Sequence, residues 1–251
     1  MSGDPENPAA SVPRRDRTPL PQRFYKTAAA GPHEAGFALL LDGRVVKTPV
    51  RRPLAVASRA VAEALAAEWD GQGDRIDPST MPITRIVNSA IDAVAGAMPE
   101  VRAEIVKYAG TDLICYRAEG PASLVVAQAS AWDPLVAWAR EALGARLVLA
   151  DGVIPVSQDA AALAAVDRAV AAFDPLALAA LSTATTLTGS AIIALAVARG
   201  RLTGEAAWAA SLVDEEWQMK QWGRDEAAML ARAFRWREMK AAALILAALA
   251  S

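Results

Sequence analysis

The stretch that decides the fold is "GFALLLDGRVVKTP", residues 36–49. Two short apolar runs flank Asp42-Gly43, a dipeptide that favours the tight type I′ turn between antiparallel strands. We therefore predict a β-hairpin here, and with it a small antiparallel sheet near the N-terminus.

Helical signals follow this hairpin directly. Ser58 is suited to cap a helix that runs toward Trp69, and "GQGD" at 71–74 has the turn chemistry to end it. Behind Pro82, apolar side chains recur at helical spacing from Ile83 to Val94. Residues 21–95 are thus predicted to form a small domain of sheet and helices.

Beyond residue 95 the punctuation is that of successive helices, which predicts a larger, mainly α-helical domain over 96–251 and an α+β fold for the chain. Its start and stop signals are Pro99, Gly110, Pro121, Gly144, Ser157 and Thr203. Gly223 is expected to break a helix, and the last helix is expected to start near Asp225. One interruption, 146–156 around Asp151-Gly152, predicts a pair of strands that packs back on the N-terminal sheet.

Composition excludes several classes of protein. The net charge of −2 supplies no field for nucleic acid or an anionic membrane. The apolar runs 191–198 and 241–250 are far shorter than the roughly 20 residues of a membrane span, so both are predicted to be buried helices. Residues 1–20 contain prolines, both charge signs and no apolar core, which indicates a disordered tail and neither a secretory signal nor a transit peptide.

Residues able to carry catalysis are scarce. His33 and Cys115 are the only histidine and cysteine, and no phosphate loop, nucleophile elbow or cluster with metal-ligand spacing occurs. We predict no catalytic residue, no metal and no cofactor. The alternative is a helical small-molecule-binding protein or enzyme with a pocket near Asp112, Tyr116 and Arg117.

A basic patch offers a first candidate for binding. Arg44, Lys47, Arg51 and Arg52 lie in "GRVVKTPVRRP", which contains no acid. These charges either contact a partner or protect an edge strand from aggregation, and the sequence leaves both interpretations open.

The second candidate is "DEEWQMKQWGRDEAAMLARAFRWREMK", residues 214–240. On a helical wheel Leu212, Glu216, Met219 and Gly223 fall within about 60°, so Glu216 lies in an apolar stripe. It either pairs with Lys220, for about 0.2–0.5 kcal/mol, or accepts hydrogen bonds from a protein partner. Trp217 and Trp222 lie on other faces, where they can anchor the helix to its neighbours.

Several blocks occur in one order along the chain: "RFYK" at 23–26, "LDGRVVKTP" at 41–49, "AAEWDGQ" at 66–72, "MPITRIVNSAID" at 81–92, "DLICYRAEGP" at 112–121, "WDPLVAW" at 132–138 and "EEWQMKQWGRDEA" at 215–227. Together they resemble the ATP-twelve family of assembly chaperones of mitochondria and alphaproteobacteria. The resemblance implies a non-enzymatic chaperone without nucleotide or metal, and we expect the chain to be a monomer. It would bind the unassembled alpha subunit of the F-one head of ATP synthase and release it to the beta subunit. With no transit peptide, a bacterial cytoplasmic location is expected, against the mitochondrial matrix for eukaryotic relatives.

The same resemblance suggests individual residues. Glu216, Gln218, Trp222, Gly223 and Glu226 match the family's motif, and with Met219 of the apolar stripe they are the predicted partner-binding residues. Trp69 matches the tryptophan of the "EWD" block and is predicted to be a packing residue that joins the two domains, and Trp217 is likewise predicted to be structural. Where mitochondrial members commonly have an aromatic residue and a histidine, this chain has Ala227 and Ala228.

Overall fold

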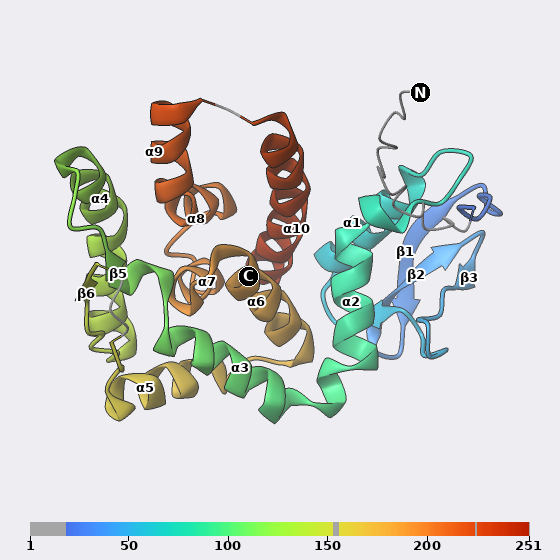
Figure 1. Ribbon diagram of the computed structural model, residues 1–251. Coiled ribbons are helices and arrows are strands. Elements are labelled where there is room, and N and C mark those ends of the chain that lie inside the picture. The colour runs from blue at the N-terminus through green and yellow to red at the C-terminus, as the bar shows by residue number, and fades with distance from the viewer. Residues whose placement is uncertain (1–18, 153–155, 224, 251) are drawn as a thin grey trace, which may run out of the picture.

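The computed structural model describes residues 19–152, 156–223 and 225–250. An N-terminal antiparallel sheet with helices is followed by a mostly helical part, which confirms the predicted fold class (Figure 1). The predicted tail lies outside the described residues except for Pro19 and Leu20.

The sheet is built around the predicted hairpin. Strands β1 (Ala28–His33) and β2 (Gly36–Leu41) are antiparallel, with Ala28 opposite Leu41. Strands β3 (Arg44–Val45) and β4 (Ala55–Val56) both pair with β2. Asp42 and Gly43 have φ of 47° and 80°, and positive φ at both central positions is what a type I′ turn requires. The predicted hairpin is therefore confirmed.

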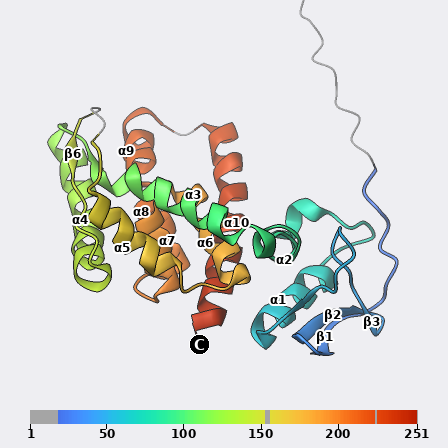
Figure 2. The same ribbon diagram turned by 90° about the horizontal axis from the view of Figure 1, so that it is seen from below.

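Helix α1 packs on the sheet, and α2 connects it to the rest of the chain. Helix α1 (Arg59–Asp70) begins after Ser58, whose Oγ accepts a hydrogen bond from the Val61 amide, as predicted. The short turn η1 (Pro78–Thr80) leads into α2 (Pro82–Asp92), whose buried face includes Ile86 and Val87. Figure 2 shows α1 and α2 between the sheet and the helical part, and α2 packs on α6 and α10 of that part.

The helical part confirms most of the predicted boundaries. Its elements are η2 (Val94–Gly96), α3 (Met98–Gly110), η3 (Leu113–Cys115), α4 (Ala122–Trp138) with a π turn (Ala139–Leu143), α5 (Ala160–Val170), α6 (Pro175–Thr188), α7 (Ala191–Ala198), α8 (Gly204–Ser211), α9 (Val213–Trp222) and α10 (Glu226–Ala250). Thr203 caps α8, and Gly144 ends the π turn with a φ of 75°. The prediction for Ser157 is wrong, because Asp159 occupies the position before α5.

The strand prediction at 146–156 also needs correction. Strand β6 (Ala150–Asp151) pairs in parallel with β5 (Tyr116–Arg117), so it lies in the helical part and does not pack back on the N-terminal sheet. The second strand of the predicted pair would include residues 153–155, which lie outside the described residues. Turn signals predict where a chain reverses, but they do not specify which strand becomes the partner.

One hydrophobic cluster runs through both parts, from Leu39 of the sheet to Ile193 of α7 and Leu246 of α10. All residues of α7 are buried, and the C-terminal run within α10 contributes Ala242, Ile245 and Leu246 to the core. No helix in the described ranges has the length and apolarity needed to cross a bilayer. The boundary between 95 and 96 stays a prediction.

Candidate binding site on helices α9 and α10

Helices α9 and α10 form an antiparallel pair at one end of the molecule. Gly223 ends α9 with a φ of 93°, a left-handed conformation that an L side chain disfavours. Figure 1 shows α9 and the first turns of α10 standing up from the helical part, each facing the other. The predicted break at Gly223 is therefore confirmed, and the two helices that it separates form a hairpin.

A groove of about 410 Å³ lies between the two helices. Met219, Trp222 and Met229 give it an apolar lining, and Gln218 and Arg232 add polar groups. Of the predicted partner-binding residues, the structure therefore brings together Gln218, Met219, Trp222 and Gly223 on one groove. Flexible methionines beside an aromatic ring are typical of surfaces that adapt to a protein partner.

The two tryptophans of α9 have different surroundings. Trp217 is half-buried, and its indole nitrogen donates to Ser123 Oγ of α4 at 3.0 Å. Trp222 is 75% exposed and meets Trp217 edge to face, with 5.9 Å between ring centroids. The expectation that both rings anchor α9 is therefore wrong for Trp222. Its ring is held from one side by Trp217 and faces solvent with the rest.

Two ion pairs join the walls of the groove. Arg232 of α10 pairs with Glu216, and Arg235 pairs with Glu215 at 3.3 Å. Arg235 also donates to the Leu187 carbonyl of α6 at 3.1 Å, which fixes α10 to the core. Of the two interpretations left open for Glu216, the pair with Lys220 is not the one formed, because the carboxylate pairs with Arg232 instead. The Glu216 side chain is still 41% exposed, so it remains accessible to a partner.

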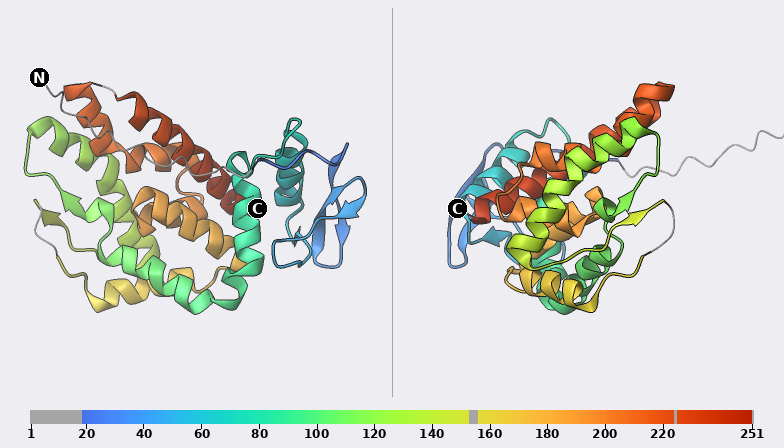
Figure 3. Two further views of the ribbon diagram at one scale, coloured as in Figure 1. Left: turned by 45° about the vertical axis from the view of Figure 1, so that its right-hand side comes forward. Right: turned by 90° about the vertical axis from the view of Figure 1, so that its left-hand side faces the viewer.

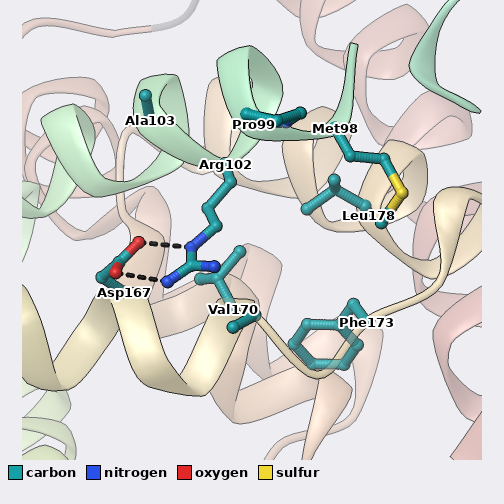
Figure 4. Close-up of a pocket in the computed structure, with 9 residues that line it drawn as sticks. Met98, Pro99, Arg102, Ala103, Asp167, Val170, Phe173 and Leu178 are labelled. Carbon is teal, nitrogen blue, oxygen red and sulfur yellow. Dashed lines mark hydrogen bonds and ion pairs between the residues drawn. The ribbon is translucent and has the colours of Figure 1, made fainter. Parts of the chain in front are cut away.

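A separate apolar cleft lies between α3 and the end of α5 (Figure 4). Met98, Val170, Phe173 and Leu178 line it, and Arg102 and Asp167 form an ion pair along one side. The Arg102 guanidinium holds the pKa of the Asp167 carboxyl below its usual range. Because these two charged groups satisfy each other, the cleft offers little free polarity for orienting a small polar ligand.

The residues of the alternative ligand site have structural partners. Asp112 is fully buried, and its carboxylate accepts hydrogen bonds from the amides of Ile114 and Ile192, which fixes the start of α7. Arg117 pairs with Asp133 at 2.7 Å. Burial raises the pKa of the Cys115 thiol to about 12, so it stays protonated and unreactive. No group of histidine, cysteine and carboxylate residues suited to a metal occurs in the described ranges.

The comparisons with known proteins agree with this architecture. The crystal structure of Atp12 from Paracoccus denitrificans matches with a TM-score of 0.84 and 43% identity, over 91% of this chain and 98% of that one. The chain belongs to the ATP12 chaperone family. The family model, described as ATP12 chaperone protein, matches residues 22–140. The resemblance seen in the sequence is thus confirmed, and the protein is a chaperone of ATP synthase assembly.

Two further relatives extend the match. The Atu1473 protein of Agrobacterium tumefaciens has a TM-score of 0.88 and 46% identity, over 93% of this chain and 88% of that one. Mitochondrial atp12 of Schizosaccharomyces pombe is 26% identical over 222 residues, which are 82% of this chain and 76% of the yeast protein.

Among the predicted site residues of this ATP12 chaperone, Glu216 does not line the groove itself but pairs with Arg232, which does, and two others lie away from it. Glu226 is exposed in the first turn of α10 and does not line the groove. Trp69 lies at the end of α1, where its indole nitrogen donates to Thr84 Oγ1 of α2 at 3.1 Å and its ring packs 5.7 Å from that of Tyr25. Trp69 thus joins the N-terminal segment to α2, and its role between domains stays a prediction.

Sequence reasoning missed the α10 side of the groove: Met229, Arg232 and Arg235. A signal for the two arginines was present. Along the sequence, Glu216 and Arg232 are equally far from position 224, and Glu215 and Arg235 are equally far from position 225. Residues that face one another across a helical hairpin have this spacing. If the chain reverses direction at Gly223, each of the two glutamates is expected to lie opposite one of the two arginines. Met229 has no comparable signal.

Proposed function

We propose that this chaperone binds the unassembled alpha subunit of the F-one sector through the α9–α10 groove and releases it to the beta subunit. An unassembled ring subunit exposes apolar interface and aggregates unless that surface is covered. The groove supplies an apolar surface for such a client, with Glu216 and Gln218 at hand for hydrogen bonds. Release follows if beta competes for the same client surface.

The observation that carries the proposal is the exposure of Trp222, at 75%, beside Met219 and Met229. A large aromatic ring held edge to face by Trp217 yet open to solvent is unfavourable for an isolated chain, but it is typical of residues that dominate protein interfaces. Asp112 and Arg117 are held by structural partners, and the Cys115 thiol stays protonated because its pKa is raised. These observations favour binding over catalysis. We place the activity in the bacterial cytoplasm, where F-one subunits are made.

The test is suppression of light scattering when urea-denatured alpha subunit is diluted into a roughly equimolar solution of the chaperone. We expect suppression, followed by transfer of alpha when beta is added. Trp222→Ala should abolish most of the protection, because truncation of a central aromatic anchor typically costs about 2 kcal/mol or more of binding free energy. Val126→Ala is the matched control, since Val126 is 68% exposed and lies on α4, outside the groove.

If well-folded chaperone fails to suppress scattering of alpha, the proposed client is wrong. If Trp222→Ala and Val126→Ala reduce protection equally, the client is bound but the α9–α10 groove is not its site. If alpha is protected but is not transferred to beta, only the proposed release step is wrong.

A further inference from the structure

A second hollow lies in the N-terminal part of the chain, which α1 and α2 connect to the helical part (Figures 1 and 3). This hairpin hollow, about 610 Å³ in volume, lies between the N-terminal segment and the β2–β3 turn. Its main lining residues are Phe24, Tyr25, Arg44, Val45, Lys47 and Trp69. It therefore contains half of the basic patch singled out in the sequence.

The floor of the hairpin hollow is aromatic and preformed. The Tyr25 hydroxyl donates to the Trp69 carbonyl at 2.6 Å, and the Tyr25 ring lies 4.6 Å beneath the guanidinium of Arg23. Arg23 is itself tied to Asp70 at 3.2 Å. Phe24 meets the edge of Tyr25 at 5.4 Å between centroids but remains 73% exposed. An apolar side chain could pack on Phe24 without any rearrangement of this floor.

The rim of the hairpin hollow is positive. Arg44 and Lys47 are exposed, and within the described ranges neither forms an ion pair. Asp42, an acid in the lining, is already engaged: its carboxylate accepts from the amides of Lys26 and Thr27 at 3.1 and 2.9 Å. Those hydrogen bonds hold its pKa below the usual range. Arg44 and Lys47 therefore face solvent as cations beside an exposed aromatic ring.

We propose that the hairpin hollow is a second docking site, which takes an extended acidic segment of a partner protein that carries one apolar side chain. Acidic groups would pair with Arg44 and Lys47, and the apolar side chain would pack on Phe24. Protection of an edge strand explains the charge of Arg44 on β3, but it does not explain an exposed phenylalanine, which itself promotes association. Two unpaired cations beside an exposed aromatic ring are complementary to a segment that carries both acidic groups and an apolar side chain.

The probe is a fluorescein-labelled peptide of about eight residues, glutamate and aspartate with one central phenylalanine, titrated with the full chain and followed by anisotropy. We expect saturable binding with a Kd on the order of tens of micromolar, weakening as salt rises. Arg44→Glu/Lys47→Glu should weaken it by about tenfold or more. The matched control is Arg146→Glu/Arg199→Glu, the same charge change on exposed residues that form no ion pair within the described ranges, which should leave the Kd within about twofold.

The apolar contact is isolated by a second comparison. Replacing the peptide's phenylalanine with alanine should weaken binding to the natural chain by roughly fivefold to tenfold, and should have little effect on Phe24→Ala. Trp222→Ala should bind the peptide as the natural chain does, which separates this site from the proposed client groove. Loss of alpha protection in Trp222→Ala with peptide binding intact would support both sites independently.

Several results would overturn the proposal. One is the absence of saturable binding below about 1 mM peptide. Another is equal weakening by the rim and control variants, which would mean unspecific attraction. Displacement of the peptide by an oligothymidine of equal charge would indicate a nucleic-acid site instead. Self-association that disappears in Arg44→Glu/Lys47→Glu would show that a second copy of the chain occupies the hollow. If neutralising Asp4, Glu6 and Asp16 makes the peptide bind more tightly, these acidic residues of the same chain compete with the peptide, and they are the occupant of the hollow.

Discussion

The ion pair between Glu216 and Arg232 allows the partner-binding role of Glu216 to be separated from its structural role. Glu216→Lys places a second cation beside Arg232 and removes the carboxylate that a client would contact. The double exchange Glu216→Arg/Arg232→Glu restores opposite charges across the groove but leaves the carboxylate on the wrong helix. The two variants should therefore differ in stability and agree in loss of function.

The magnitude follows from exposure. The Glu216 and Arg232 side chains are 41% and 21% exposed, so solvent screens the pair and its loss costs about 0.5–1 kcal/mol. Repulsion between the introduced lysine and Arg232 adds a similar amount, giving about 1–2 kcal/mol for the single variant. For a chain of 251 residues this corresponds to a fall in Tm of about 2–8 °C. The double exchange should recover more than half of that fall.

Thermal unfolding measures the first effect, and suppression of alpha-subunit scattering at a temperature well below both Tm values measures the second. We expect protection to be lost in the single variant and not restored in the double exchange. A double exchange that restores stability and protection together would refute direct contact by Glu216, because the ion pair alone would then carry the activity.

Three further variants test other parts of the structure. Trp69→Arg should lower the free energy of unfolding by about 3 kcal/mol, because it removes the bond to Thr84 and the packing on Tyr25, and an unchanged Tm would exclude a packing role. Trp222→Ala should change that free energy by less than about 0.5 kcal/mol, since its ring is 75% exposed, and a large loss in urea unfolding would make the residue structural. Burial raises the pKa of Asp112 to about 6 from 3.8, so the folded chain binds more protons than the unfolded one between these values and stability should fall as pH rises through this window, by at most about 3 kcal/mol. Urea midpoints at several pH values should show that this fall is smaller in Asp112→Asn, and identical slopes in both chains would contradict the assignment.

The elements that sequence could predict are those determined by a few adjacent residues. The Asp42-Gly43 turn needs positive φ at two positions, and the α1 cap needs only Ser58 and the Val61 amide. Each is local, so the pattern specifies it completely. The partner of β6 was predicted wrongly because a two-residue strand carries no pattern that selects Tyr116 and Arg117 among other edges.

The candidate site was predictable on one helix only. Motif resemblance and the apolar stripe pointed to α9, including Met219 and Trp222, but a helical wheel treats a helix as isolated. It therefore offered Lys220 as the partner of Glu216, although Arg232 on α10 is the one that binds it. Whether Lys220 or Arg232 pairs with Glu216 depends on the distance between α9 and α10. The spacing of residues within α9 gives no information about that distance.

Helix α10 links the proposed groove to the N-terminal part, and this explains its mixed composition. Its first half carries Arg232 toward α9, and farther along Glu238 pairs with Arg85 of α2. In its last turns the Ala248 carbonyl accepts from Ser58 Oγ, at the start of α1. Helix α10 is continuous, so its charged half, which borders the groove, is positioned by its apolar half, which packs in the core. The apolar C-terminal run is therefore the anchor that holds Arg232 and Arg235 in place opposite α9.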